Sequence, residues 1–331
     1  MYCAEQACIM QKREWCHMAE PEFDLEGIEV NPVDDLLTGI LINYQVVNNV
    51  TYAIASNYEC KLDLWLPLNA QGAVPTLIYI HGGGWVSGKR EQYALMFLPF
   101  IEMGFAVVNV QYRMAHVSHA PSAVQDCRAA LRWVIYNADK YGFDTERLVL
   151  FGHSAGAHLA LMTGMLDSSA GLDWEIPGGS DTEREEAMWR FYADRQAGKE
   201  EMDVAAIIEW SGITDVNDLL SGPNRKGYAQ AWMGTVPYAE ELARTVSPLT
   251  YVRPGLPPIL LIHGDADPIV PYSHAVHLHE ALDEAGVRNG LVTIPGGGHV
   301  RFERRQIAKV YALIRELLVK NDLMPTRDDP R

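Results

Sequence analysis

The sequence predicts an α/β fold in which a mostly parallel central sheet is covered by helices on both faces. From residue 60 onward, short apolar runs of strand length alternate with longer runs of helical period. This alternation is typical of parallel strands joined by crossover helices. In addition, the residues that could carry chemistry fall directly after the apolar runs, and open α/β sheets bind their ligands at that edge.

The apolar runs fix the expected elements. Strands are expected at residues 60–66, 76–80, 105–110, 147–151, 204–210, 258–262 and 290–294. Helices are expected at residues 91–103, 121–141, 155–166, 271–286 and 301–320, and two more at 5–18 and 34–44.

The most informative motif is Gly-His-Ser-Ala-Gly at residues 152–156, which joins the strand at 147–151 to the helix at 155–166. Strand, tight turn and helix form the setting in which Gly-x-Ser-x-Gly acts as a nucleophile elbow. The flanking glycines let backbones approach closely, and the helix N-terminus favours negative charge. The alternative is a turn that only packs a helix on a strand. The context favours a nucleophile at Ser154.

A glycine-rich loop, His-Gly-Gly-Gly-Trp at residues 81–85, follows an expected strand. Three consecutive glycines leave backbone N–H groups free to turn toward a ligand. We therefore expect an oxyanion hole made by the N–H groups of Gly83, Gly84 and Ala155. A phosphate-binding loop would end in Gly-Lys-Ser/Thr, whereas residues 88–90 are Gly-Lys-Arg.

Two later loops supply an acid and a base. His-Gly-Asp-Ala-Asp-Pro at residues 263–268 and Gly-Gly-Gly-His at residues 296–299 each follow an expected strand. The chain order Ser154, Asp267, His299 is the order of the α/β-hydrolase triad. In that triad Ser154 attacks, His299 takes and returns the proton, and Asp267 orients the imidazole.

These motifs resemble the esterase and lipase branch of the α/β-hydrolases, which includes hormone-sensitive-lipase-like enzymes and bacterial feruloyl-esterase-like carboxylesterases. Further matching segments lie at residues 62–67, 111–113, 121–133 and 210–215. The resemblance covers roughly residues 45 to 320. It implies a cofactor-free serine hydrolase of small to medium esters. Aryl-formamidase-like relatives share the motifs, so an amide substrate stays open.

Other side chains could compete for the acid role. In the family pattern the second aspartate, Asp267, is the triad acid, so Asp265 is expected to hydrogen-bond its own loop in Asx fashion. Asp215 follows another strand but comes at the wrong place in the chain order, and we expect it to cap the next helix.

Three other histidines lie near the motifs. His158 is one helical turn after Ser154, so it is expected to pack or orient rather than act as the base. His81 is expected to fix the oxyanion loop by hydrogen bonds. Trp85, His153 and Trp210 lie beside the catalytic loops and are expected to line the substrate pocket.

The chain divides into an N-terminal helical arm or cap contribution at residues 1–45, an α/β-hydrolase catalytic domain at 46–322, and a C-terminal tail at 323–331. Insertions are expected at 167–203 and 217–247. The first carries several aromatic residues. They suit a lid or acyl-pocket wall as well as a surface excursion packed on the core.

Composition narrows the partners. The formal net charge of −16 argues against nucleic acid and anionic membranes. No apolar run reaches the length of a membrane span, and residues 1–20 lack the apolar segment of a signal peptide. The five cysteines are irregularly spaced, and they fit neither a disulfide framework nor a zinc pattern. Cys127 is expected to be buried in a core helix.

We therefore predict a serine carboxylesterase that hydrolyses short-chain acyl or aryl esters through an acyl-enzyme. No metal or other cofactor is expected, the partner is a small-molecule ester, the location is cytoplasmic, and a homodimer is left open. An aryl-formamidase-like amide hydrolase with the same triad is the first alternative. A non-catalytic ligand-binding protein on this scaffold is less favoured, because all three triad members are present.

Overall fold

The computed structural model describes residues 43–55, 57–173 and 202–325. The chain divides into two compact units, Met1–Gly39 and Ile40–Arg331, and all of the described residues belong to the second. The expected helix at 5–18, nearly all of the one at 34–44 and most of the insertion at 167–203 lie outside the described residues.

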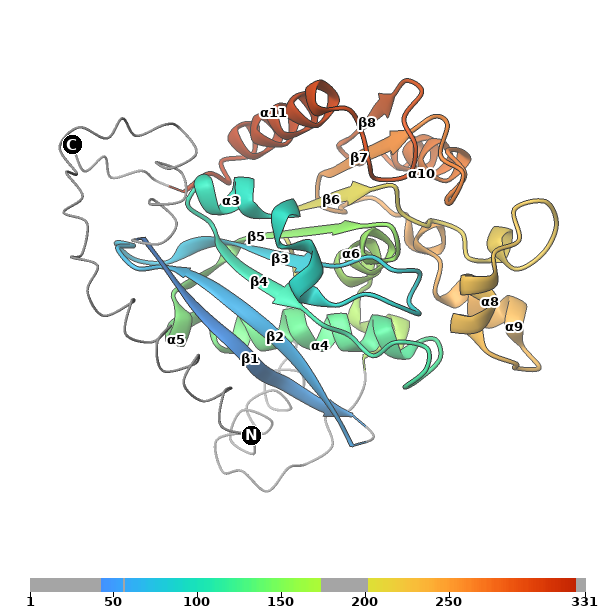
Figure 1. Cartoon of the computed structure of the whole chain (residues 1–331), viewed down its shortest axis with the longest axis horizontal. Helices are drawn as coiled ribbons and strands as arrows, with labels where there is room; N and C mark the ends of the chain where they lie inside the picture. Colours follow the sequence, from blue (N-terminus) through green and yellow to red (C-terminus); the bar gives the residue numbers. More distant parts are fainter. Residues whose placement is uncertain (1–42, 56, 174–201, 326–331) are drawn as a thin grey trace, which may run out of the picture. The chain divides into compact units, whose positions relative to one another are not determined.

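Within the described residues, eight strands form one sheet in the spatial order β1-β2-β4-β3-β5-β6-β7-β8 (Figure 1). The strands are β1 (Tyr44–Ala55), β2 (Tyr58–Pro67), β3 (Val74–Ile80), β4 (Ala106–Val110), β5 (Phe143–His153), β6 (Ala206–Trp210), β7 (Ile259–Gly264) and β8 (Asn289–Ile294). The β1–β2 and β2–β4 pairs are antiparallel, and every other neighbouring pair is parallel. The mostly parallel sheet that the sequence predicts is confirmed.

The helices connect and cover the strands. The α-helices are α3 (Leu98–Glu102), α4 (Ser122–Tyr136), α5 (Ala138–Tyr141), α6 (Ala155–Met165), α8 (Gly227–Met233), α9 (Ala239–Thr245), α10 (Ser273–Glu284) and α11 (Arg304–Lys320). The 3₁₀ helices are η2 (Arg90–Met96), η3 (Ser168–Ala170), η4 (Asn217–Leu219) and η5 (Pro248–Tyr251).

All seven predicted strands are present, but β1 was not predicted. Its burial does not alternate, and its pairing with β2 shifts register between Val47 and Val50 and again between Thr51 and Ala53. These irregularities blur the period of two on which strand prediction depends. The strand begins at Tyr44, where the sequence suggested the end of a helix.

Two predicted helices are shorter pieces in the structure. The helix expected at 91–103 is η2 followed by α3, because the backbone leaves helical geometry at Tyr93 and Pro99 opens a new helix. The helix expected at 121–141 breaks at Asn137 into α4 and α5. The Asn137 side chain donates to the Trp133 carbonyl at 2.8 Å, which is a local bond that competes with helix continuation.

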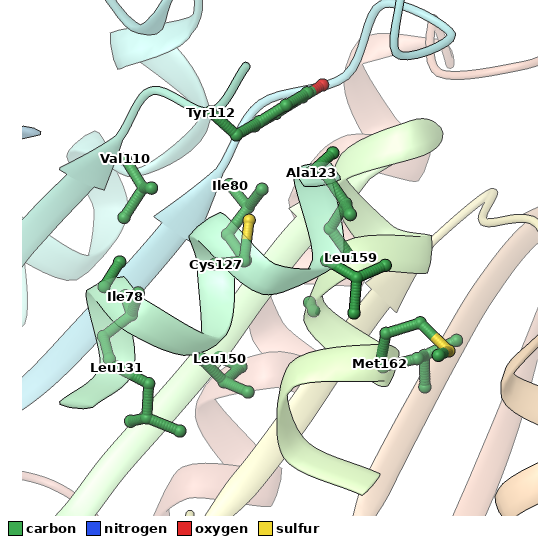
Figure 2. Packing of buried hydrophobic residues seen from close by; sticks show 14 of the residues in the cluster. Ile78, Ile80, Val110, Tyr112, Ala123, Cys127, Leu131, Leu150, Leu159 and Met162 are labelled. Atoms are coloured by element: carbon green, nitrogen blue, oxygen red, sulfur yellow. The ribbon is translucent and has the colours of Figure 1, made fainter. Parts of the chain in front are cut away.

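Two apolar layers hold the sheet. On one face, Ile78 and Ile80 of β3 pack with residues of α4, α6 and α10; on the other, Leu77 and Tyr79 pack with residues of α3 and α11. Successive side chains of β3 therefore serve opposite cores, as strand geometry requires. Figure 2 shows the first layer, where Cys127 of α4 lies among strand and helix side chains. The prediction that Cys127 is buried is confirmed, since it is 1% exposed.

This arrangement positions the chemistry-bearing loops. The elbow follows β5, the acid loop follows β7 and the histidine loop follows β8, so all three leave the carboxyl edge of neighbouring parallel strands. Almost every residue of α6 is buried. A helix that is buried all round belongs to the interior, and it fixes the elbow against the core. In the three described ranges, no helix is both long and apolar enough to cross a membrane.

Candidate active site

The turn at Ser154 is strained and depends on its glycines. Ser154 has φ 56° and ψ −125°, a backbone conformation that side-chain-bearing residues rarely adopt. A Cβ on Gly152 would collide with the Gly156 carbonyl, and one on Gly156 with the Ile80 carbonyl. Only glycine at both positions lets β5, α6 and β3 approach this closely. The serine side chain is therefore held above the end of the sheet.

Three side chains from three loops form a hydrogen-bonded chain. The Ser154 hydroxyl donates to His299 Nε2 at 2.8 Å. His299 Nδ1 donates to Asp267 Oδ2 at 2.7 Å. The His299 side chain is 17% exposed and that of Asp267 is fully buried. The structure thus brings together the three residues that the motifs single out, although 145 positions separate Ser154 from His299.

Asp267 is held as a carboxylate. Its Oδ1 accepts from the N–H groups of Ile269 at 2.7 Å and Val270 at 3.1 Å. Burial opposes the charge, but hydrogen bonds from His263 and His299 outweigh it and keep the Asp267 pKa well below its usual range. The Asx turn expected at Asp265 therefore belongs to Asp267, which corrects that prediction.

Asp265 lies on the same loop but points elsewhere. Its Oδ1 accepts the Gly296 N–H at 2.7 Å, so it ties the acid loop to the histidine loop. In the described structure no histidine side chain contacts it by a hydrogen bond or ion pair. The expected bond from Asp265 to its own loop is therefore replaced by a bond that crosses to the histidine loop.

The glycine-rich loop leaves backbone N–H groups without an acceptor in the part of the chain that the structure describes. Among the described residues, no acceptor bonds the N–H of Gly83, Gly84 or Ala155. Gly83 has φ +126°, and a Cβ there would collide with the Ser87 carbonyl. Glycine is therefore required at Gly83 by both conformation and space.

His153 fixes this loop from behind. Its Nε2 accepts the Gly82 N–H at 3.3 Å, so the ring proton lies on Nδ1, which donates to the Tyr79 hydroxyl at 2.8 Å. Burial lowers the His153 pKa to about 3 and keeps the ring neutral. His153 is 3% exposed, so the prediction that it lines the substrate pocket is wrong. It anchors the glycine-rich loop at residues 81–85.

His81 and His158 occupy the roles expected for them. His81 Nδ1 bonds the Gly82 carbonyl at 2.7 Å, inside the loop that it was expected to fix. His158 Nδ1 accepts from Trp85 Nε1 at 3.2 Å, and its Nε2 donates to the Val246 carbonyl at 2.7 Å. Burial lowers the pKa of both rings to about 4. Neither ring contacts Ser154 Oγ.

The two tryptophans expected in the pocket are core residues. Trp85 is fully buried, and its ring stacks on Trp232 of α8 at 4.2 Å between centroids. Trp210 is 1% exposed and stacks on Phe302 at 5.3 Å, in the layer that also holds α11. The prediction that they line the pocket is wrong, because adjacency in sequence to a catalytic loop does not say to which side of the backbone a large side chain turns.

The segment 217–247 reaches the site through α8. The Tyr228 hydroxyl donates to the Ile269 carbonyl of the acid loop at 3.3 Å. A Cβ on Gly84 would lie 3.0 Å from the Tyr228 side chain. Tyr228 therefore contacts both the acid loop and the oxyanion loop. At the start of the segment, Asp215 accepts the Asn217 N–H at 2.9 Å. The N-cap of η4 is Val216, which makes no side-chain cap bond, so the prediction that Asp215 caps this helix is corrected to a local bond made from one residue before the cap.

Several supporting residues were not predicted from the sequence. The Ser211 hydroxyl bonds the His299 carbonyl, the Trp210 carbonyl accepts the Ser154 N–H at 2.8 Å, and Tyr79 orients His153. No sequence pattern marks Ser211 or Tyr79. The exception is His263, whose Nε2 lies 3.1 Å from Asp267 Oδ2. His263 lies near the end of β7, four residues before Asp267. This spacing in the sequence could have indicated that His263 lies close to the acid.

The geometry suits nucleophilic acyl transfer. A hydroxyl, an imidazole and a carboxylate are connected in series, and N–H groups are available beside the hydroxyl for a developing oxyanion. Within the three described ranges, no group of three or more histidine, cysteine, aspartate or glutamate side chains is placed to hold a metal ion.

The sheet, the elbow and the loop positions define an α/β-hydrolase. The chain belongs to the BD-FAE family, whose model matches residues 62–282. This is a feruloyl-esterase-like family of α/β-hydrolases, so the resemblance stated from the motifs is confirmed.

Individual relatives agree with this placement. Esterase LipC of Mycobacterium tuberculosis is 29% identical over 233 residues, 68% of this chain and 52% of that protein. The chain spans about half the length of LipC and of a second esterase of the same organism, LipQ. A truncated carbohydrate esterase from gut microbiota is 27% identical, with a TM-score of 0.67 over 83% of this chain and 96% of the other.

An esterase of Thermogutta terrifontis, Est2, has the same fold. It is 25% identical to this chain, with a TM-score of 0.66 over 87% of this chain and 95% of Est2. Est2 has also been solved with propionate bound and with butyrate bound.

Proposed function

We propose that this protein is a serine carboxylesterase in which Ser154, His299 and Asp267 form the catalytic triad. The observation that carries the proposal is the continuous chain from Ser154 Oγ through both nitrogens of His299 to Asp267 Oδ2, with links of 2.8 and 2.7 Å. Membership of a feruloyl-esterase-like family supports it, as do the esterase names of LipC and Est2.

The reaction follows from this chain of bonds. Ser154 Oγ attacks the acyl carbon and its proton passes to His299 Nε2, while Asp267 stabilises the imidazolium. The N–H groups of Gly83, Gly84 and Ala155 receive the oxyanion. His299 then returns the proton to the departing alcohol, which leaves an acyl-enzyme. Water then attacks the acyl carbon and gives its proton to His299 Nε2. His299 returns this proton to Ser154 Oγ as the carboxylic acid is released.

Small acyl groups are the proposed substrates. The Tyr228 side chain packs against Gly84 of the oxyanion loop. A bulky aromatic side chain at this position would leave little room for a long acyl chain. Est2, which has the same fold, binds propionate and butyrate. We therefore propose a short-chain or aryl ester as the substrate.

The cytoplasmic location and the homodimer remain predictions.

A substrate panel with one variant tests the proposal. Hydrolysis of p-nitrophenyl acetate, butyrate, octanoate and palmitate would be compared with hydrolysis of methyl ferulate and N-formylkynurenine. We expect a maximum at acetate or butyrate. Ser154→Ala should lower turnover by about 10⁴- to 10⁶-fold because the nucleophile is removed. Ser221→Ala, at an exposed serine, is the matched control and should match the wild type.

The outcomes separate the alternatives. Cleavage of N-formylkynurenine without ester hydrolysis would replace the esterase by an aryl-formamidase-like amidase. Undiminished turnover in Ser154→Ala would contradict the triad. If the wild-type protein hydrolysed none of the substrates, this result would favour a non-catalytic ligand-binding protein.

A further inference from the structure

A second histidine binds the proposed triad acid. His263 stands at the end of β7, and its Nε2 lies 3.1 Å from Asp267 Oδ2 and 3.1 Å from the Val270 carbonyl. Asp267 Oδ2 is also the oxygen that accepts from His299 Nδ1 at 2.7 Å. Both His263 and the Asp267 carboxylate have fully buried side chains. Two imidazoles therefore share one carboxylate oxygen, and only His299 continues to Ser154.

A buried carboxyl group stands behind His263. Glu209 lies on β6, in register with Leu261 of the neighbouring parallel strand β7, so its side chain is on the same face of the sheet as that of His263. Glu209 is fully buried. Its Oε1 accepts the Gly212 N–H, whereas its Oε2 has no hydrogen-bond partner in the described structure.

His263 also has an open position. Within the described residues its Nδ1 has no hydrogen-bond partner, although it is buried. An unpaired polar atom in the interior is costly, and here two of them occur on neighbouring strands. The two groups interact through charge: burial opposes the charged form of His263, but the bond to Asp267 and the charge of Glu209 raise its pKa.

We propose that His263, backed by Glu209, is a positioning residue of the triad that clamps Asp267 Oδ2 and limits how strongly this carboxylate holds a proton on His299. The inference rests on the proposed function. A donor that shares the acceptor oxygen withdraws charge from it, so the bond from His299 is weaker than it would be with the oxygen to itself. Neither His263 nor Glu209 contacts substrate in this proposal.

The surroundings define what else could titrate. His263 faces Glu209 from β6, Asp267 from its own loop, and Tyr272 and His274 from the start of α10. Burial lowers the pKa of His274 to about 4, so it is neutral in the range where the enzyme would work. His299 faces Asp267, Ser154 and His153.

The test is the pH dependence of kcat/KM on a p-nitrophenyl ester. His263→Leu removes the donor, so we expect the acidic limb to move to higher pH by about one unit and kcat to fall by about 10- to 100-fold. His263→Gln keeps an N–H at the Nε2 level and should restore the position of the limb. Glu209→Gln keeps the acceptor for Gly212 and should move the limb in the same direction by less.

Controls separate positioning from folding. His274→Leu removes another buried histidine, one that bonds the Thr214 N–H at 3.0 Å and Asp218 at 3.2 Å. It should lower stability without moving the limb. Where His263→Leu does not fold, His263→Asn replaces it, because its amide reaches only the Nδ1 level.

A rate for His263→Leu that falls equally at every pH, with the acidic limb in its wild-type position, would overturn the role of His263. If the acidic limb of the kcat/KM profile stays in place in Glu209→Gln, the proposed support of His263 by Glu209 would be overturned. Activity that survives Ser154→Ala would instead contradict the proposed function, which distinguishes the two failures.

Discussion

The buried ionisable residues of the site differ mainly in the groups that lie beside them. His81, His153 and His158 are buried against neutral groups, and burial lowers their pKa values to between about 3 and about 4. They remain neutral and hold backbone and tryptophan groups in place. His263 and Asp267 are buried against each other, and each favours the charged form of the other. Residue type alone does not distinguish these cases. The sequence predicted the supporting roles of His81 and His158, but not those of His153 and His263.

Glu209 gives a pH-dependent prediction at the residue scale. Burial raises its pKa from 4.5 to about 7. Between these two values the folded protein keeps a proton that the unfolded chain releases, so the free energy of unfolding falls as pH rises through this window. The full contribution is about 3 kcal/mol, lost between about pH 4.5 and 7. Glu209→Gln has no such group, so its stability should fall less across the window.

Urea denaturation at pH 4.5 and pH 7.5 measures this difference. Glu280→Gln, at an exposed position of α10, should behave like the wild type. Equal losses of stability in the wild type and Glu209→Gln would show that Glu209 titrates normally.

At the scale of elements, prediction succeeded where burial follows the period of the element. The strands β3 to β8 lie inside the sheet or against helices, and their apolar runs stand out in the sequence. The strand β1 is exposed at several positions and its ladder with β2 is irregular, so it left no clear period. The kink at Tyr93 and the break at Asn137 depend on local hydrogen bonds and tertiary contacts, which outweigh helix propensity.

The helix α8 supports the oxyanion loop from outside the sheet, and this contact gives a prediction at the same scale. Trp232 is fully buried and stacks on Trp85, next to Gly84. Trp232→Ala should lower the free energy of unfolding by about 3–5 kcal/mol. It should also lower kcat/KM, because Trp85 loses the surface that holds it.

Chemical denaturation measures the loss of stability. Ester hydrolysis, measured under conditions where the variant is fully folded, tests the effect on kcat/KM. The matched control is Tyr238→Ala, since Tyr238 is 57% exposed on the same insertion, and we expect a change within about 0.5 kcal/mol. Normal kcat/KM in a folded Trp232→Ala protein would show that α8 does not support the site.

At the scale of the whole molecule, topology explains why the triad could be predicted from sequence. Parallel strands deliver all their carboxyl ends to one edge, so motifs that follow β5, β7 and β8 must meet there. The directions of single side chains are not fixed by the topology. Trp85 lies just after β3 and Trp210 ends β6, two other strands of the same sheet, yet both side chains turn into the core. Motif placement therefore predicts the backbone of the site better than its lining.

The central claim is that Ser154 is the nucleophile, and covalent labelling tests it most directly. The protein would be incubated with diethyl p-nitrophenyl phosphate, whose phosphorus accepts a serine oxygen as p-nitrophenolate leaves. Peptide mass mapping would locate the adduct while ester hydrolysis is followed in parallel. We expect one diethylphosphoryl group on Ser154, formed at the rate at which activity is lost. Loss of activity with the label on another residue and Ser154 unmodified would contradict this assignment.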